Sequence, residues 1–272
     1  MAGKYRVGFI GGGNMAEPMV AAILKEKICS PNETIVSDLL AERRELFEAE
    51  FGASVTDNNR QLVANSERIV FSIKPQTFTA VAEEIADVIT DEHMLISIMA
   101  GVSTGRIAAA FPKVKARVVR VMPNLPIRVG AGVAALCAGE NATEHDVAEA
   151  RAVFDAGGGT IVVNDERLMD AVTAVSGSGP AYFYYFVESI VQGGVACGLS
   201  EDDALKLAKY TCLGAGRMML ETDDPPAELR RKVTSKGGTT QAAIEHMNKV
   251  GIPEGIRNAV KAAYERGKEL GS

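Results

Sequence analysis

The chain has 272 residues, of which 47% are hydrophobic and 24% charged, and its formal net charge is −6. This length suits two domains better than one, and the composition is that of a globular protein. The acidic balance argues against a nucleic-acid-binding protein. Neither a signal peptide nor an apolar run long enough to span a membrane is expected.

Cysteine and histidine are sparse and scattered, with no C-x-x-C pair and no H-E-x-x-H motif. We therefore expect free thiols, a cytoplasmic location and no metal site. For the same reason a histidine is not expected to act as the catalytic acid or base. The cysteines are Cys29, Cys137, Cys197 and Cys212, and the histidines are His93, His145 and His246.

The N-terminal segment predicts a strand, a tight glycine turn and a helix, in that order. The turn, Gly11-x-Gly13-x-x-Ala16, matches the G-x-G-x-x-G/A pattern of dinucleotide-binding proteins. Gly11 permits the turn, Gly13 lets the main chain approach a pyrophosphate, and Ala16 lets the helix lie close to the strand. The unpaired N–H groups at the start of the helix suit phosphate. For the motif alone, a turn in an ordinary α/β unit is the alternative.

The second predicted strand, residues 34–37, supports the dinucleotide interpretation. It ends at Asp38, roughly 20 residues beyond Ala16, where the fingerprint has its ribose-binding carboxylate. A carboxylate at this position predicts NADH, because it repels the 2′-phosphate of NADPH. Arg43 and Arg44 follow in the next helix and could offset that repulsion, so the sequence leaves the cofactor preference open.

Strands and helices alternate through residues 1–164, which predicts a doubly wound α/β sheet of the Rossmann type. Ligands of such sheets bind beyond the carboxyl ends of the strands. The segments at those ends should therefore line one cleft; they are residues 11–14, 37–38, 72–75, 98–101 and 122–124.

Residues 165–272 have a helical pattern and predict a second, all-α domain. The helix expected at 181–197 is apolar nearly all round in its first half. Such a helix is buried by the protein's own core or by another subunit, and we favour a dimer interface. Residues 235–240 bring two glycines and two threonines to the start of a later helix, which suits a bound carboxylate. A simple helix cap with a flexible lead-in is the alternative.

Together these motifs resemble the pyrroline-5-carboxylate reductases over essentially the whole chain. The resemblance rests on residues 9–15, Lys74-Pro75, residues 122–124, 176–182 and 235–240. The last two segments together are specific to this family, whereas the first occurs in many dehydrogenases. The resemblance implies NAD(P)H-dependent reduction of the cyclic imine 1-pyrroline-5-carboxylate to L-proline, the last step of proline biosynthesis. It also implies a homodimer interlocked through the helical domain, or a higher assembly of such dimers.

The resemblance also implies the site residues. NADPH or NADH would contact Gly11, Gly12, Gly13, Asn14, Met15, Ser37, Asp38, Asn59, Ser72, Ile73, Lys74, Pro75, Ile98, Met99 and Ala100. The substrate would meet Glu166, Gly238, Thr239 and Thr240, with the Thr240 hydroxyl at the ring nitrogen. Lys236 stands where the family usually has proline, which adds a cation near an anionic ligand and leaves the stiffness of the loop open.

Two other functions fit parts of the pattern. A β-hydroxyacid dehydrogenase would place a catalytic lysine on a helix of the second domain, but Lys206, Lys209 and Lys232 lie in no such motif. A dinucleotide-binding regulator without catalysis would need the glycine fingerprint but not the Gly-Gly-Thr-Thr turn. That turn therefore favours the enzyme.

Overall fold

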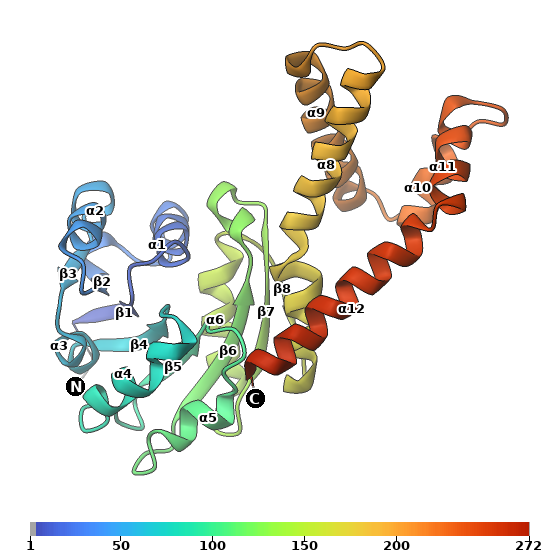
Figure 1. Cartoon of the computed structure of the whole chain (residues 1–272). Coiled ribbons are helices and arrows are strands. Elements are labelled where there is room, and N and C mark those ends of the chain that lie inside the picture. Colours follow the sequence, from blue (N-terminus) through green and yellow to red (C-terminus); the bar gives the residue numbers. More distant parts are fainter. Residues whose placement is uncertain (1–3, 272) are drawn as a thin grey trace. The chain divides into compact units, whose positions relative to one another are not determined.

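The computed structural model describes residues 4–271, which form two compact units (Figure 1). The first unit runs to Ser178 and also includes the chain from Ala263 on, and the second is Gly179–Ala262. The sequence places the junction at 164/165, just after the last strand. Within the described residues no helix is both long and apolar enough to cross a bilayer.

The first unit is built on one eight-stranded sheet with helices on both faces. Its strands are β1 (Tyr5–Ile10), β2 (Thr34–Ser37), β3 (Ser54–Thr56), β4 (Ser66–Phe71), β5 (Met94–Ser97), β6 (Arg117–Pro123), β7 (Gly132–Ala138) and β8 (Gly158–Val162). Its main helices are α1 (Ala16–Lys25), α2 (Ala41–Phe51), α3 (Asn59–Ala64), α4 (Phe78–Ile85), α5 (Thr104–Ala109), α6 (Glu144–Asp155) and α7 (Met169–Val172).

The strand order is β3-β2-β1-β4-β5-β6-β7-β8, and its first six members have the Rossmann order. The expected doubly wound sheet is thus confirmed. One feature was not predicted: β7 pairs antiparallel with β6, whereas the other neighbours pair in parallel. A short 3₁₀ helix at Leu125–Val129 and the left-handed Gly130 (φ 70°) reverse the chain between these two strands.

The core lies on both faces of this sheet because alternate strand residues point to opposite sides. In β4, for example, Val70 joins a cluster with residues of α1, α2 and α6, while Ile69 and Phe71 join one with residues of α3, α4 and α5. In Figure 1, α1 and α2 lie over one side of β1, and α3 and α4 over the other. Burial on both faces explains the apolar runs within these strands, such as residues 69–71 of β4.

Some helices begin or end in 3₁₀ or π-helical turns. Pro75 begins a 3₁₀ turn, Pro75–Thr77, and α4 follows it and ends at Ile85. Thr173–Gly177 is a π-helical segment, in which the N–H of Ser178 donates to the carbonyl oxygen of Thr173 at 2.8 Å. The chain therefore stays helical there, with one wide turn.

The second unit is all-helical, as the sequence predicts. Its helices are α8 (Gly179–Ala196), α9 (Glu201–Glu221), α10 (Pro226–Lys232), α11 (Thr239–Lys249) and α12 (Ile252–Gly271), the last of which continues into the first unit. Small residues let α8 and α9 approach, because a Cβ on Gly194 would lie 3.2 Å from that of Ala204.

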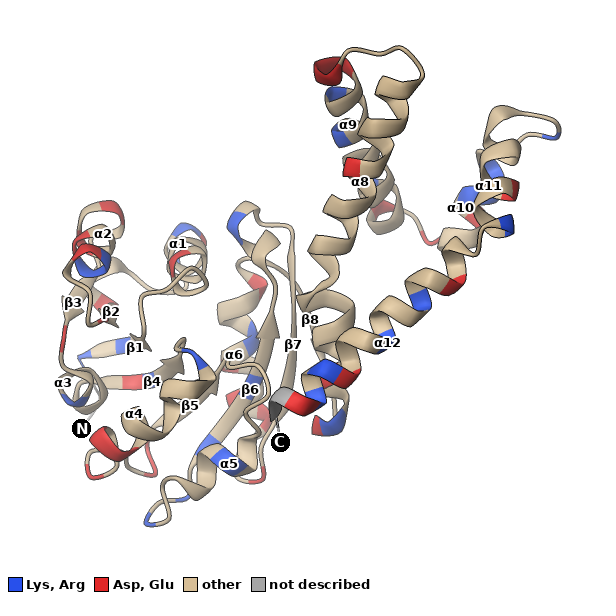
Figure 2. Ribbon diagram, in the orientation of Figure 1, with Lys and Arg blue, Asp and Glu red and all other residues tan. Residues whose placement is uncertain are grey.

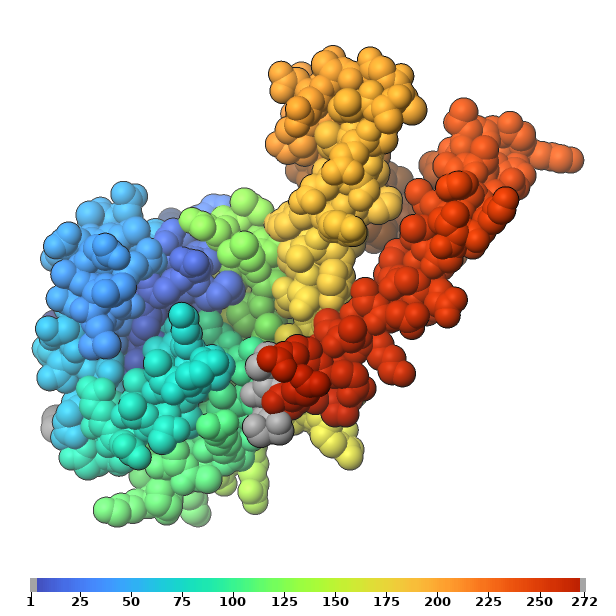
Figure 3. Space-filling view, viewed as in Figure 1, coloured from blue at the N-terminus to red at the C-terminus, as the bar shows by residue number. Residues whose placement is uncertain are grey.

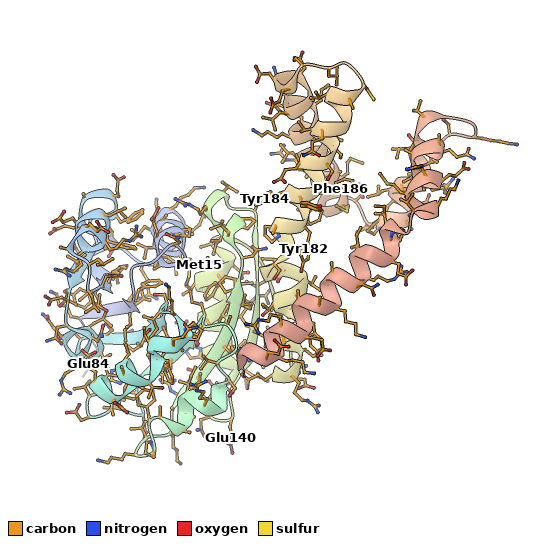
Figure 4. The ribbon with its side chains drawn as sticks, in the orientation of Figure 1. Met15, Glu84, Glu140, Tyr182, Tyr184 and Phe186 are labelled. Atoms are coloured by element: carbon orange, nitrogen blue, oxygen red, sulfur yellow. The ribbon has the colours of Figure 1, made fainter. Side chains whose placement is uncertain are left out.

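The aromatic face of α8 is uncovered in the single chain. Phe183, Tyr184 and Tyr185 are 57%, 57% and 73% exposed. Figure 2 shows α8 almost without charge, since Glu188 is its one charged residue. Figure 4 labels Tyr182, Tyr184 and Phe186 along this helix, and Figure 3 shows its side chains on the surface. The helix is therefore not buried by its own unit.

Candidate active site

The predicted cofactor residues gather at the carboxyl ends of five neighbouring strands, β3, β2, β1, β4 and β5. Residues 11–15 lie between β1 and α1. Ser37 is the last residue of β2, Asp38 follows it, and Asn59 begins α3. Residues 72–75 follow β4 and residues 98–100 follow β5. Figure 4 shows Met15 at the start of α1. The strand order reverses on the two sides of β1, which is where such sheets bind dinucleotides.

The three glycines after β1 are required for three different reasons. Gly11 has φ 96°, and a Cβ there would lie 2.8 Å from the carbonyl oxygen of Ser72. A Cβ on Gly12 would lie 2.9 Å from the ring of Phe47. A Cβ on Gly13 would meet nothing within 4 Å. The protein itself thus gives no packing reason for Gly13, and the open space before it fits the close approach of a pyrophosphate.

Hydrogen bonds join the strand ends around this turn. The N–H of Gly11 donates to the carbonyl oxygen of Ser37 at 2.8 Å, and the Ser72 hydroxyl donates to that of Gly11 at 2.6 Å. The Ser37 hydroxyl donates to Asn59 Oδ1 at 2.7 Å, and Asn59 Nδ2 donates to Glu84 at 2.8 Å. These hydrogen bonds connect the turn to the end of β2 and to the segment after β4.

The residues after β4 and β5 offer mainly main-chain groups. Met99 is 2% exposed, and its side chain lies in the core on one face of the sheet. Its N–H is 3.3 Å from the Ser97 hydroxyl. Lys74 is exposed and leads into the 3₁₀ turn at Pro75. Any contact of Met99 with a cofactor would therefore be made by its backbone.

Glu166 lies within the first unit, in an ion-pair network that the sequence analysis missed. Its carboxylate accepts hydrogen bonds from the Thr104 N–H at 2.8 Å and the Thr104 hydroxyl at 2.7 Å. Arg120 Nη1 donates to the same carboxylate at 3.2 Å, and Arg120 Nη2 lies 3.7 Å from Asp170. The available signal was Arg120 itself, a cation in the middle of an apolar strand, which requires a buried partner.

The network also affects Cys137 on β7. Burial, followed by the negative charge of Glu166, raises the pKa of the Cys137 thiol. The thiol therefore stays protonated at neutral pH and is not an activated nucleophile. No group of three or more His, Cys, Asp and Glu residues within 4–271 is arranged to hold a metal ion.

The turn at residues 235–240 leads into α11, with Gly238 as its N-cap. Gly237 is left-handed (φ 71°), and the N–H of Gly238 already donates to the carbonyl oxygen of Ser235 at 3.1 Å. The donors that this conformation offers a ligand are therefore the N–H groups of Thr239, Thr240 and Gln241, which have no partner within the helix. The helix dipole adds a favourable field for an anion.

A cavity of about 640 Å³ lies at the opposite edge of the sheet, and it holds none of the predicted site residues. Its lining includes Ser66, Met94 and Arg117, which begin β4, β5 and β6. Arg117 donates to Asp146 of α6 at 2.6 Å. The ionic groups here thus connect the sheet to α6.

Known proteins are similar to this chain over its whole length. Residues 166–270 match the family described as pyrroline-5-carboxylate reductase dimerisation, and residues 6–101 match NADP oxidoreductase, coenzyme F420-dependent. A pyrroline-5-carboxylate reductase of Synechocystis is 41% identical over 98% of this chain and 99% of its own. The chain belongs to the pyrroline-5-carboxylate reductase family. An Arabidopsis thaliana member is 38% identical over 99% of this chain and 96% of its own.

Solved structures of the family have the same fold. The pyrroline-5-carboxylate reductase of Coxiella burnetii has a TM-score of 0.93 at 34% identity, covering 99% of both chains. The Plasmodium falciparum pyrroline carboxylate reductase, solved with NADP bound, has a TM-score of 0.87 at 28% identity, covering 100% of both. The match to the dimerisation family includes the uncovered helix α8, so the chain carries a domain for association.

We expect Gly11→Ala to damage both the fold and cofactor binding. The new Cβ would meet the backbone of Ser72, and a left-handed φ strains any other residue, at a cost of about 2 kcal/mol in the free energy of unfolding. Thermal unfolding and titration with reduced cofactor, followed by its fluorescence, measure the two effects.

Gly13→Ala is the matched control, because the protein leaves room for its Cβ. The unfolding midpoint of this variant should stay near that of the unmodified chain. Its affinity for the reduced cofactor should fall at least roughly tenfold, which corresponds to about 1.4 kcal/mol of binding free energy. Undiminished affinity in Gly13→Ala would mean that the pyrophosphate does not approach this turn.

Proposed function

We propose that this chain is a pyrroline-5-carboxylate reductase, which transfers a hydride from NAD(P)H to the imine carbon of 1-pyrroline-5-carboxylate and yields L-proline. The observation that carries the proposal is the 41% identity to such an enzyme over 98% of the chain. The open glycine turn on the sheet edge and the amide-rich start of α11 supply the two binding functions that this reaction needs.

We assign cofactor binding to residues 1–164, and substrate binding and dimerisation to residues 165–272. The open face at Gly13 and the fixed strand ends fit a dinucleotide, and the fifteen predicted residues from Gly11 to Ala100 remain the proposed contacts. When bound, NAD(P)H supplies the hydride, and the protein supplies position. Holding two reactants in line can lower the barrier by on the order of 7–11 kcal/mol.

The start of α11 is the proposed carboxylate site. The N–H groups of Thr239 and Thr240 point out of the helix end, and the dipole favours the anion. In the conformation described, the N–H of Gly238 is engaged with Ser235, so Gly238 contributes the shape of the turn. Lys236, exposed in this turn, adds a positive charge for the same anion.

The ring nitrogen must be protonated for the imine to accept hydride well. We propose that the Thr240 hydroxyl hydrogen-bonds this nitrogen. A hydroxyl is a weak acid, so the proton comes with the substrate or through water. Glu166 is proposed to favour the cationic form, because a nearby negative charge stabilises a cation.

The direct test is oxidation of reduced cofactor in the presence of pyrroline-5-carboxylate, with proline measured as the product. We expect absorbance at the nicotinamide band to fall only when the imine is added, with one proline formed per cofactor oxidised. Activity with β-hydroxyacids in place of the imine would favour the rival dehydrogenase. Cofactor binding without turnover of either substrate would favour a regulator.

We further propose a homodimer, or a higher assembly of dimers, in a reducing compartment such as the cytoplasm. The uncovered α8 supports association, and the four free cysteines, two of them buried, support the compartment. Light scattering on the purified protein should give the mass of a dimer or a multiple of it, and a monomer at micromolar concentration would contradict the assembly.

A further inference from the structure

The carboxylate of Asp38 is fixed against the glycine turn. Its Oδ2 accepts the N–H of Gly12 at 2.8 Å, and its Oδ1 accepts the N–H of Leu40 at 2.9 Å. The backbone N–H of Asp38 donates to Thr56 at 3.2 Å, which ties the segment to β3. Each carboxylate oxygen can accept one more hydrogen bond. The group is therefore oriented to accept from a ribose hydroxyl beside the turn.

Arg43 is already held in contacts of its own beside the turn. Its Nε donates to the carbonyl oxygen of Gly12 at 2.6 Å, and its Nη2 pairs with Glu17 at 3.0 Å. The guanidinium lies 5.6 Å from the centre of the Phe47 ring, and the side chain is only 20% exposed. Arg43 therefore supports the turn from within the protein.

Arg44 is the other cation near the end of β2. Its Nη1 donates to the carbonyl oxygens of Asp38 at 2.7 Å and Leu39 at 3.0 Å, and the side chain is half-buried. Turning Nη1 toward a 2′-phosphate would give up these two main-chain hydrogen bonds. In the conformation described, it stabilises the loop that carries Asp38.

We propose that this chain uses NADH in preference to NADPH, and that Asp38 sets the preference. The proposal rests on the proposed reductase function. The fixed carboxylate accepts the 2′-hydroxyl of NADH and repels the phosphate that replaces it in NADPH. The two nearby arginines already donate to main-chain carbonyl oxygens of the glycine turn and of the Asp38 loop. A relative was solved with NADP bound, and the preference proposed here rests on Asp38, Arg43 and Arg44 of this chain.

The test compares kcat/KM for the two cofactors at saturating pyrroline-5-carboxylate. We expect the full-length protein to favour NADH by on the order of 10- to 100-fold, the range for an uncompensated like-charge contact. Asp38→Asn keeps the size of the side chain and removes its charge, and it should lower the ratio at least about tenfold, through a lower KM for NADPH. Asp38→Ser is the second variant if Asp38→Asn does not fold.

Glu42→Gln is the matched control, since it removes one exposed carboxylate from the first turn of α2 and should leave the ratio unchanged. Preference for NADPH in the unmodified protein would overturn the inference, as would an unchanged ratio in both Asp38 variants. A selective loss of NADPH use in Arg44→Gln would also overturn it, by placing Arg44 on the phosphate. If no imine is reduced with either cofactor, the proposed function fails, and direct binding of NADH and NADPH still tests the preference.

Discussion

Thr240→Ala should lower kcat by roughly 100-fold, which is the usual cost of removing one donor aimed at the reacting group. Thr240 is the second residue of α11 and is not its N-cap, which is Gly238. Loss of the hydroxyl should therefore leave the helix intact. The proposed cofactor contacts lie on the first unit, so affinity for reduced cofactor should survive. Steady-state kinetics and cofactor titration on the same sample separate the two quantities.

Two further variants make this result specific. Thr240→Ser keeps a hydroxyl and should recover most of the turnover. Thr222→Ala removes a hydroxyl that donates to the Met218 carbonyl oxygen at 2.7 Å, at the end of α9, and should leave kcat unchanged. Unaltered kinetics in Thr240→Ala would remove Thr240 from the site, and the ring nitrogen would then need another donor.

Arg120→Met should cost about 3 kcal/mol in the free energy of unfolding, as expected when one partner of a buried ion pair is removed. The Arg120 side chain is 7% exposed and faces both Glu166 and Asp170. Methionine fills a similar volume but leaves the two partly buried carboxylates without the Arg120 counter-charge. Urea unfolding at neutral pH measures the change.

Arg167→Met is the control, because this ion pair with Asp165 involves an arginine that is 91% exposed. It should change stability by less than about 1 kcal/mol. Adding Glu166→Gln and Asp170→Asn to Arg120→Met should restore part of the lost stability, since the stranded charges are removed with their partner. Equal losses in Arg120→Met and Arg167→Met would show that the Arg120 network is not what stabilises this part of the fold.

The glycine turn and the strand ends could be predicted because they depend on local properties. Gly11, Gly13 and Ala16 have a fixed spacing, and a buried parallel strand such as β4 carries an apolar run at residues 69–71. The direction of β7 could not be predicted in the same way. An apolar run indicates that a strand is buried but not which way it pairs, and here the reversal depends on a short 3₁₀ helix and Gly130.

In the candidate site, too, only features set by neighbouring residues could be predicted. The place of Asp38 could be predicted because it comes directly after the second strand. The partners of Arg120 could not be predicted, because Glu166 and Asp170 lie 46 and 50 positions further along the chain. The hydrogen bond from the Gly238 N–H to Ser235 depends on the left-handed conformation of Gly237. It could not be predicted, because a glycine in the sequence can adopt either a left-handed or a right-handed conformation.

The uncovered aromatic residues of α8 should make the stability of the protein depend on its concentration. In the proposed dimer, side chains that face water in one chain would be buried against the second chain, so association would contribute to the free energy of folding of the helical unit. The unfolding temperature should therefore rise with protein concentration. Substitutions on this face would be most damaging in dilute solution and could pass unnoticed in a concentrated sample.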